Sequence, residues 1–196
     1  MNFDPLEKVL SEFEKGKFVI VLDEHREEEG DFFLLAEFVT PEKINFLLHE
    51  ARGMICVACA KSIIDKFELP LMVKENGDKF GTNFCVSVDA QSGITTGISA
   101  PDRAKTISVL ADTEATAEDL VRPGHSFPLL AKETDRFGHT ESSVILAKKV
   151  NKIPAVVICE ILNSSGEKAN TAELFSLAKK LNCPITNLEI IEDSVT

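Results

Sequence analysis

Two purely apolar runs near the start of the chain flank one strongly polar segment. The runs are 18–22 (Phe-Val-Ile-Val-Leu) and 32–36 (Phe-Phe-Leu-Leu-Ala). Short apolar runs bounded by polar residues are typical of buried β-strands. We therefore predict two adjacent strands that are connected by the polar segment 23–31.

Apolar residues at helical spacing and further apolar runs follow along the rest of the chain. Asp4, Pro5 and Glu7 are the residue types expected at the N-cap, first and third positions of a first helix, which would end at Gly16. The periodicity predicts further helices and strands as follows: helices over 40–53, 62–67, 102–110, 140–149 and 171–181, and strands over 54–59, 84–88, 126–131, 154–161 and 185–191.

This order of elements favours an α+β fold. Strands and helices alternate imperfectly, and two strands follow each other near the start, which favours a mixed sheet over a doubly wound parallel one. The 196 residues show no internal repeat and no linker long enough to separate two domains. We therefore predict a single domain over residues 1–196.

Composition narrows the class of partner. The chain has 44% apolar and 27% charged residues, as soluble globular domains do, and a formal net charge of −11. This charge argues against nucleic acid or an anionic membrane as the main partner, although a local basic pocket can still bind a phosphate group. The sequence shows neither a membrane-spanning run nor an N-terminal signal, and its five cysteines lie mostly in apolar runs. These features predict a cytoplasmic protein with reduced thiols.

The polar segment 23–31 contains six carboxylates and one arginine. Like charges in one loop repel each other unless a cation offsets them, and hard divalent metals prefer carboxylate oxygens. A solvated acidic turn is the alternative interpretation. An EF-hand is excluded, because that motif has glycine at its sixth position and Gly30 is the eighth residue from Asp23.

Three further polar features stand at the ends of predicted elements. The sequence 122–125 (Arg-Pro-Gly-His) predicts a rigid turn that presents a histidine. The sequence 136–141 places an arginine and a histidine before a helix, where Thr140 and free backbone N–H groups can receive a phosphate group. Glu160 lies in an apolar run and needs a partner there. The alternatives are an exposed histidine in an ordinary turn, a structural role for His139 at the helix start, and a structural ion pair of Glu160.

These features together supply the groups that metal-assisted chemistry on a sugar phosphate requires. The acidic segment and one histidine suit a divalent metal, and an arginine with a threonine suits a phosphate group. A separate histidine and glutamate suit proton transfer.

The Cys56-x-x-Cys59 pattern lies in a predicted strand. Residues three apart in a strand point to opposite faces, and no second pair completes a zinc site. We therefore predict two buried structural thiols rather than a metal or redox site.

Several short motifs, in order from about residue 5 to residue 192, resemble those of the 3,4-dihydroxy-2-butanone 4-phosphate synthase family of riboflavin biosynthesis. The motifs are Arg26-Glu27 with Glu29-Gly30-Asp31, Ala36-Glu37-Phe38, Thr40-Pro41-Glu42, 95–99 (Thr-Thr-Gly-Ile-Ser) with Asp102-Arg103, 122–125, 138–141 (Gly-His-Thr-Glu) and Cys159-Glu160. The resemblance implies a three-layer α+β domain in which helices flank a mixed sheet. It also implies a lyase that converts D-ribulose 5-phosphate to L-3,4-dihydroxy-2-butanone 4-phosphate and formate. The chain resembles the stand-alone form of the enzyme.

The resemblance also implies cofactors, partners and residue roles. The family uses Mg²⁺ or Mn²⁺, which we expect at two ions per active site, and acts as a homodimer with sites near the interface. By position, His125 and Glu160 would be catalytic. The other residues that match are the metal ligands Glu27 and His139, the substrate-binding residues Arg26, Glu27, Asp31, Arg136, Phe137, Gly138, His139, Thr140 and Glu160, and the pocket-lining residues Glu29, Cys56, Thr95 and Asp102.

Some positions depart from the family pattern. They are Leu22, His25, Asn76-Gly77, Phe137 and Ile145, and Glu28 also stands where asparagine is common. None of these departures removes a predicted ligand or catalytic residue, but several border the expected pocket. They leave two alternatives open: a paralogue that acts on another sugar phosphate with the same metal site, or a non-catalytic relative that binds a metal or ligand.

Overall fold

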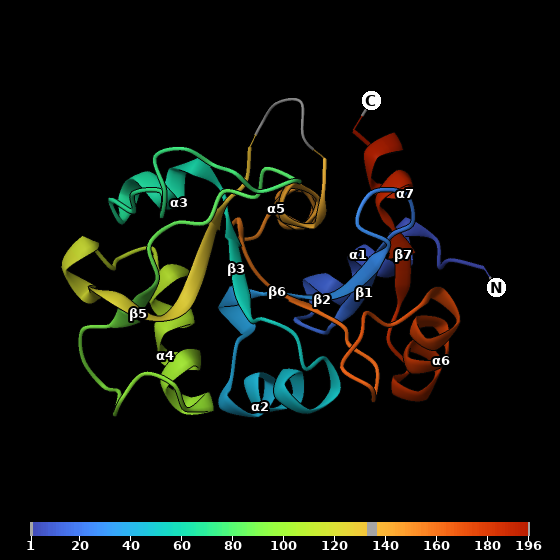
Figure 1. Ribbon diagram of the computed structural model, residues 1–196, viewed down its shortest axis with the longest axis horizontal. Helices are drawn as coiled ribbons and strands as arrows, with labels where there is room; N and C mark the ends of the chain where they lie inside the picture. Colours follow the sequence, from blue (N-terminus) through green and yellow to red (C-terminus); the bar gives the residue numbers. More distant parts are fainter. Residues whose placement is uncertain (1, 133–136, 196) are drawn as a thin grey trace.

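The computed structural model describes residues 2–132 and 137–195, and seven strands within these residues form one sheet (Figure 1). The elements in chain order are α1 (Leu6–Glu14), β1 (Val19–Asp23), β2 (Glu29–Leu35), η1 (Ala36–Phe38), α2 (Pro41–Glu50), β3 (Cys56–Cys59), α3 (Lys61–Lys66), β4 (Val88–Ala90), α4 (Ala100–Leu110), η2 (Ala117–Asp119), β5 (Leu120–Leu130), α5 (His139–Lys149), β6 (Ala155–Glu160), α6 (Thr171–Leu181), β7 (Ile185–Asn187) and α7 (Leu188–Asp193).

The sheet is mixed, as predicted. Its strand order is β4-β5-β3-β6-β2-β1-β7. The pairs β1–β7 and β3–β5 are parallel, and the other neighbours are antiparallel. The predicted pair of early strands, β1 and β2, forms an antiparallel ladder in which Asp23 lies opposite Glu29. The acidic connection between them is therefore short, and it lies at the same end of the sheet as the last residue of β6, Glu160, which lies opposite Asp31.

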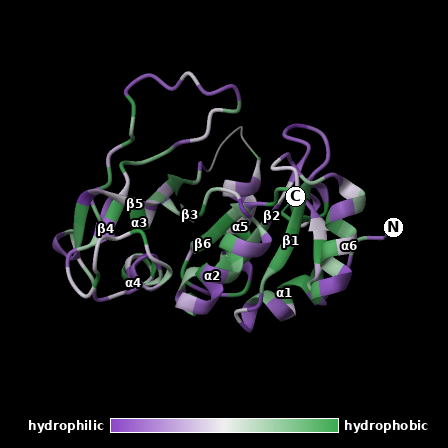
Figure 2. Cartoon of the chain, turned by 60° about the horizontal axis from the view of Figure 1, so that its bottom comes forward, coloured by the Kyte–Doolittle hydropathy of each residue, from purple (hydrophilic) through white to green (hydrophobic). Residues whose placement is uncertain are grey.

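Helices cover both faces of the sheet and give three layers. One apolar core lies between the sheet and helices α2, α4 and α6, and a second lies between the sheet and helices α1, α5 and α7. Figure 2 shows the central strands in apolar colours and polar outer faces on the helices. The strands of the middle of the sheet are buried on both faces, which explains their continuous apolar runs.

Four sequence-based predictions of element ends were wrong. The strand predicted over 84–88 lies further along the chain, as β4 (Val88–Ala90). Phe84 and Cys85 form only isolated bridges. The turn predicted over 122–125 lies within the long strand β5, at a shift in register. Val121 pairs with Asp89 and Ser126 pairs with Val88, so residues 122–125 lie in the irregularity between these two pairs.

The other two differences have local causes at opposite ends of the chain. The last strand stops at Asn187, whose side-chain oxygen accepts the Ile190 N–H at 3.0 Å and so starts helix α7. Asp4 does not cap helix α1. Its N–H donates to the Ile185 carbonyl at 2.8 Å and its carboxylate accepts the Ile185 N–H at 3.1 Å, so it ties the chain start to β7.

None of the helices in residues 2–132 and 137–195 is long and apolar enough to cross a membrane. The five cysteines are all free thiols, and four of them are buried. Cys56 and Cys59 point into different cores on opposite faces of the sheet, so both thiols are buried and lie on opposite faces as predicted. Burial raises the pKa of both thiols, so neither is a ready nucleophile.

Candidate active site

The acidic loop 24–28 is folded around the carboxylate of Asp23. This carboxylate accepts the backbone N–H groups of His25, Arg26 and Glu27 at 3.1, 2.9 and 3.1 Å. Burial alone raises the pKa of Asp23, but these three hydrogen bonds outweigh it and hold the pKa below its ordinary value. Asp23 therefore acts as a structural anchor that gives the loop a defined shape.

Two cationic side chains, one in the loop and one outside it, tie the loop to the rest of the fold. The guanidinium of Arg26 donates to the Phe137 carbonyl, just before helix α5. The ammonium group of Lys168, from the connection between β6 and α6, donates to the Glu27 carbonyl. These contacts place positive charge beside a segment whose carboxylates repel each other. The loop is thereby tied at Arg26 and at the Glu27 backbone to two segments that lie more than a hundred residues downstream.

His139 is the first residue of α5, and it is buried against the acidic segment. Its Nε2 lies 3.2 Å from the Val21 carbonyl, which can only accept a hydrogen bond, so Nε2 carries a proton. Its Nδ1 faces the carboxylates, 3.4 Å from an oxygen of Glu27 and 4.0 Å from an oxygen of Asp31. A backbone carbonyl that fixes one ring nitrogen while the other faces acidic groups is the usual environment of a metal-binding histidine.

The charges around His139 shift its pKa and those of its neighbours. Burial lowers the pKa of His139, but the carboxylates of Asp31, Glu27 and Glu29 outweigh it and raise that pKa to about 9. Burial raises the pKa of Glu29 to about 7 and raises the pKa of Asp31 well above its ordinary value. Without a metal, the cluster therefore holds extra protons to limit the repulsion between its carboxylates.

These donors fit a divalent cation. Glu27, Glu29 and His139 each offer one ligand atom, and these three atoms lie within 4.8 Å of one another. One oxygen of the buried Asp31 carboxylate has no hydrogen-bond partner among the described residues. Carboxylate oxygens and an imidazole nitrogen suit Mg²⁺ or Mn²⁺, and such an ion would offset the buried negative charge. Of these groups, the sequence predicted Glu27 and His139 as ligands, and the structure adds Glu29.

Glu160 lies beside this cluster. It ends β6, and its carboxylate accepts the Met54 N–H at 2.8 Å, which is the partner that the sequence required. Gly53 leaves the space for this carboxylate, since a Cβ atom there would lie 2.7 Å from the Glu160 Oε2 and 2.3 Å from its carbonyl oxygen. The backbone of 53–54 thus fixes the position of Glu160 on the end of the sheet.

A cavity of about 460 Å³ joins these groups. Its carboxylates come from β2, β6 and the acidic loop, and its remaining lining comes from β3, β5, β6, α5 and the connections that precede β4 and follow β6. The lining residues are Glu27, Glu29, Asp31, Cys56, Lys79, Phe80, Thr82, Phe84, Leu129, His139, Thr140, Ile158, Glu160 and Lys168. The structure therefore gathers seven of the residues predicted for the site around one cavity: Glu27, Glu29, Asp31, Cys56, His139, Thr140 and Glu160.

Other predicted residues lie differently. Arg26 and Phe137 contact each other beside the cavity rather than lining it. Gly138 donates its N–H to the Glu141 carboxylate at 3.2 Å at the start of α5. Arg136 lies outside the described residues. Of the predicted phosphate-binding pair, Thr140 is thus the residue that the structure places in the cavity.

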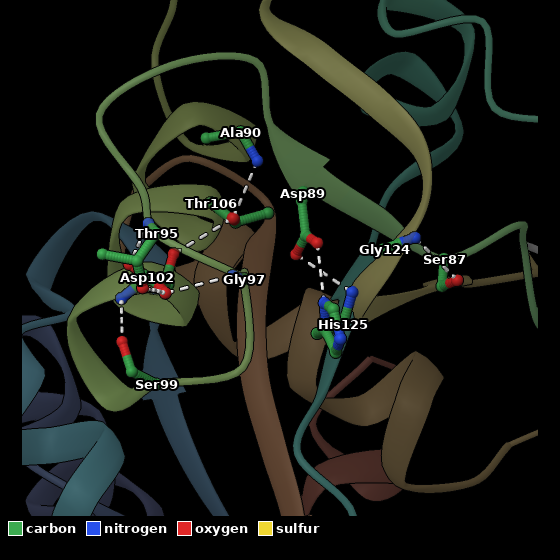
Figure 3. A network of polar contacts seen from close by, with 10 residues as sticks. All are labelled: Ser87, Asp89, Ala90, Thr95, Gly97, Ser99, Asp102, Thr106, Gly124 and His125. Carbon is green, nitrogen blue, oxygen red and sulfur yellow. Dashed lines mark hydrogen bonds and ion pairs between the residues drawn. The ribbon is translucent and has the colours of Figure 1, made fainter.

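His125 is held by a separate network on β4 and β5 (Figure 3). Its Nδ1 lies 2.7 Å from one oxygen of the buried Asp89, and its backbone N–H donates to the other at 3.0 Å. Its side chain is 42% exposed, and it does not line the cavity. Asp89 was not predicted from the sequence, because only the pairing of β4 with β5 brings it to His125.

Thr95 and Asp102 support this network instead of lining the cavity. The Asp102 carboxylate accepts the Thr95 hydroxyl at 2.6 Å and the N–H groups of Thr95 and Gly97 at 2.9 and 3.0 Å (Figure 3). The Thr95 hydroxyl and these N–H groups hold the pKa of Asp102 well below its usual range. Gly97 has φ +96°, and a Cβ atom there would lie 2.5 Å from the His125 Nδ1. Asp102 therefore holds a glycine against His125 where no side chain fits.

The pKa shifts predict how stability depends on pH. Glu29 and His139 have folded-state pKa values of about 7 and 9, above their ordinary values of 4.5 and 6.5. A group with a raised pKa binds its proton more tightly in the folded state, so its stabilising effect is lost as pH rises through that pKa. In EDTA, we expect the free energy of unfolding to fall by on the order of 2 kcal/mol between pH 5 and pH 9.

Thermal unfolding in EDTA at a series of pH values measures this loss. Added Mg²⁺ should restore stability most strongly at high pH, where the ligands are deprotonated. In the Glu29→Gln variant, the fall in the free energy of unfolding below about pH 7 should disappear, and the fall above about pH 7 should remain. A melting temperature that rises steadily from pH 5 to pH 9 in EDTA would contradict the charge distribution described above.

Comparisons with known proteins agree in pointing to one family. A family described as 3,4-dihydroxy-2-butanone 4-phosphate synthase matches residues 7–193. A protein of that name from Neisseria meningitidis serogroup A is 45% identical, and the match covers 97% of this chain and 54% of that protein. The chain thus spans about half the length of that relative. The riboflavin biosynthesis protein RibBA of Synechocystis is also 45% identical, and the match covers 95% of this chain and 34% of that protein.

Solved structures of similar length match over nearly the whole chain. A 3,4-dihydroxy-2-butanone 4-phosphate synthase in complex with two magnesium ions is 35% identical, with a TM-score of 0.94, covering 98% of this chain and 97% of its own. The Candida albicans enzyme of the same name is 34% identical, with a TM-score of 0.92, and the match covers 100% of both chains. The predicted α+β architecture, with helices on both faces of a mixed sheet, is thereby confirmed.

Proposed function

Because the chain belongs to the 3,4-dihydroxy-2-butanone 4-phosphate synthase family, we propose that it converts D-ribulose 5-phosphate to L-3,4-dihydroxy-2-butanone 4-phosphate and formate in riboflavin biosynthesis. The observation that carries this proposal is the single cavity that holds Glu27, Glu29, Asp31, His139 and Glu160. A ligand set for a hard cation next to a separate carboxylate suits chemistry on a ketose.

The proposed cofactor is Mg²⁺ or Mn²⁺, at two ions per site. Glu27, Glu29 and His139 would hold it, with the free oxygen of Asp31 nearby. A bound divalent cation would polarise the carbonyl and neighbouring hydroxyl oxygens of the substrate and make the α-proton removable. The similar structure with two magnesium ions supports both the metal and its number.

The side chains of the cavity would then position the substrate and move protons. Glu160 is fixed by the Met54 N–H, and its other carboxylate oxygen can take a proton from the sugar carbon and return it. Asp31 binds substrate hydroxyl groups, and its raised pKa lets it also donate a hydrogen bond when protonated. Thr140, at the start of α5, faces the cavity where helix N–H groups favour the phosphate group. Arg26 and the segment 136–139 complete the predicted substrate contacts.

We further propose that the protein acts as a homodimer, with residues 1–196 as one domain, and that each site takes its His125 from the second subunit. His125 is exposed and does not line its own cavity. Three large apolar residues, Met54, Ile98 and Val121, are 40%, 54% and 36% exposed. Met54 contacts Glu160 through its N–H, Ile98 follows Gly97 in the chain, and Val121 pairs with Asp89, so exposed apolar surface lies beside both catalytic groups. Such a surface suits contact with another copy.

The predicted cytoplasmic location stays a prediction.

Formate release tests the proposed function. Purified protein with added Mg²⁺ is expected to release formate from D-ribulose 5-phosphate, and excess EDTA should lower the rate by about 1,000-fold or more, because a Lewis-acid metal contributes several kcal/mol to such a barrier. Readdition of Mg²⁺ after EDTA should restore the rate and serves as the control for protein damage.

Two negative outcomes separate the alternatives. If metal-loaded protein releases no formate from ribulose 5-phosphate but transforms another sugar phosphate, the chain is a paralogue with a changed substrate. If it binds sugar phosphates and transforms none, it is a non-catalytic relative. Either outcome would overturn the proposed reaction.

A further inference from the structure

One wall of the cavity has no role in the proposed chemistry. Lys79, Phe80 and Thr82 line it, and they come from the long, mostly polar connection between α3 and β4 that extends from the body of the protein (Figure 2). This wall belongs to neither the acidic cluster nor helix α5. It is therefore a separate contribution to the cavity, and none of its residues was predicted from the sequence.

Hydrogen bonds within the segment 76–82 give it a defined turn. The Asn76 side chain accepts the Asp78 N–H at 2.9 Å and donates to the Thr82 carbonyl at 2.8 Å. The Asp78 carboxylate accepts the Thr82 N–H at 2.8 Å, and the Gly81 N–H donates to the Asp78 carbonyl at 3.1 Å. Lys79 lies inside this closed set of contacts. Its backbone is therefore presented to the cavity by an ordered turn rather than by a loose chain.

Lys79 is the uncommitted cation of the cavity. Lys79 and Lys168 are the lysines among its described lining residues, where no arginine occurs. Lys168 already donates to the Glu27 carbonyl. The Lys79 ammonium lies 5.0 Å from the centre of the Phe80 ring, and it has no hydrogen bond or ion pair with another described residue. Its positive charge is available to a ligand.

A sugar phosphate that enters this cavity has two opposite requirements. Its hydroxyl end must approach the acidic cluster, where metal ions compensate the carboxylates. Its phosphate group carries about two negative charges and is repelled by the same carboxylates, so a cation on a wall away from them favours its binding. Lysine binds a phosphate group as a compact point charge, and the Phe80 ring holds the Lys79 ammonium beside the cavity by a cation–π contact.

We propose that Lys79 binds the phosphate group of the substrate and so sets the preference of this site for phosphorylated sugars. This role rests on the proposed function and adds to it a phosphate-recognising residue on a wall away from helix α5. Lys79 and Thr140 line the same cavity from different elements, so together they can contact one phosphate group from two sides.

Steady-state kinetics of the metal-loaded full chain test this role. Lys79→Ala should raise KM for D-ribulose 5-phosphate by about 10- to 100-fold, since charged hydrogen bonds contribute about that much, and should change kcat less than about 3-fold. Its inhibition constant for inorganic phosphate should rise similarly. Lys79→Arg should keep most of the affinity. Lys74→Ala is the matched control, because Lys74 is exposed on the same connection and does not line the cavity.

Isothermal titration with inorganic phosphate separates this proposal from the proposed function. If the wild-type protein releases no formate, the proposed function fails, yet weaker phosphate binding by Lys79→Ala than by Lys74→Ala still supports the role of Lys79. If Lys79→Ala and Lys79→Gln both unfold at the wild-type temperature and bind phosphate and substrate as the wild type does, the proposal is overturned. A fall in kcat with unchanged KM would also overturn it, because it would indicate a role in loop structure.

Discussion

Replacing Glu160 by glutamine is expected to lower kcat for formate release by about 10²- to 10⁴-fold, the usual contribution of a general acid–base group. Glutamine keeps the size of the side chain, and its amide oxygen can still accept the Met54 N–H that now contacts the carboxylate at 2.8 Å. What the variant loses is the ability to take and return a proton. If the repeated proton transfers of the proposed reaction pass through Glu160, the loss should appear in kcat more than in KM.

The fold of this variant should be intact. Glu160 is only partly buried, and the neighbouring Asp31 loses a repelling charge when Glu160 becomes neutral. We therefore expect a melting temperature at or above that of the wild type and an unchanged or slightly weakened affinity for Mg²⁺. Glu167→Gln, an exposed carboxylate in the connection that follows β6, is the matched control and should keep full activity. A Glu160→Gln rate within about threefold of wild type would contradict proton transfer by Glu160.

The fold was predictable from the sequence where local signals dominate. The buried strands β1 and β6 and helix α2, which Thr40 caps at its start, follow from apolar runs, periodicity and one hydroxyl that accepts the Lys43 N–H. The strand order β4-β5-β3-β6-β2-β1-β7 was not predictable in this way, because it depends on crossovers between segments that are distant in sequence. The same limit explains β5, whose start is decided by its pairing with β4 rather than by its own residues.

The residues of the site also divide into those that local sequence signals predict and those that depend on long-range contacts. Glu27, His139 and Glu160 could be predicted, because each is a chemically distinctive residue at the end of a predicted element. Strand β2 begins at Glu29, and residues two apart in a strand share one face, so Glu29 lies on the same face as Asp31. This position makes Glu29 a further candidate ligand. The partnership of Asp89 with His125, and the positions of Lys79 and Lys168 in the cavity, depend on long-range contacts that no local pattern encodes.

His125→Ala is expected to abolish activity as Glu160→Gln does, but the two inactive variants should restore activity when their subunits are mixed. The reason is geometric. Glu160 lines the cavity of its own chain, whereas His125 is exposed beside Asp89 and lies outside that cavity. If each site combines the cavity of one subunit with His125 of the other, a dimer of the two variants contains one intact site and one site that lacks both groups.

The expected recovery can be stated in advance. Random exchange of equal amounts of the two variants makes half of the dimers mixed, and each mixed dimer has one working site of two, so about a quarter of the wild-type activity should return. Two differently tagged preparations of His125→Ala, mixed in the same way, should stay inactive. Co-purification of the tags must show that exchange has occurred.

The alternative arrangement gives an opposite result. If His125 acted in its own subunit, every chain in the mixture would carry one lesion in its own site, and no exchange could restore activity. Mixed dimers without activity would therefore show that a movement within one chain brings His125 to its cavity. A monomeric protein at assay concentration, measured by sedimentation, would exclude the shared site directly. Recovery near a quarter would instead assign His125, its Asp89 partner and the Gly97 turn held by Asp102 to the active site of the neighbouring subunit.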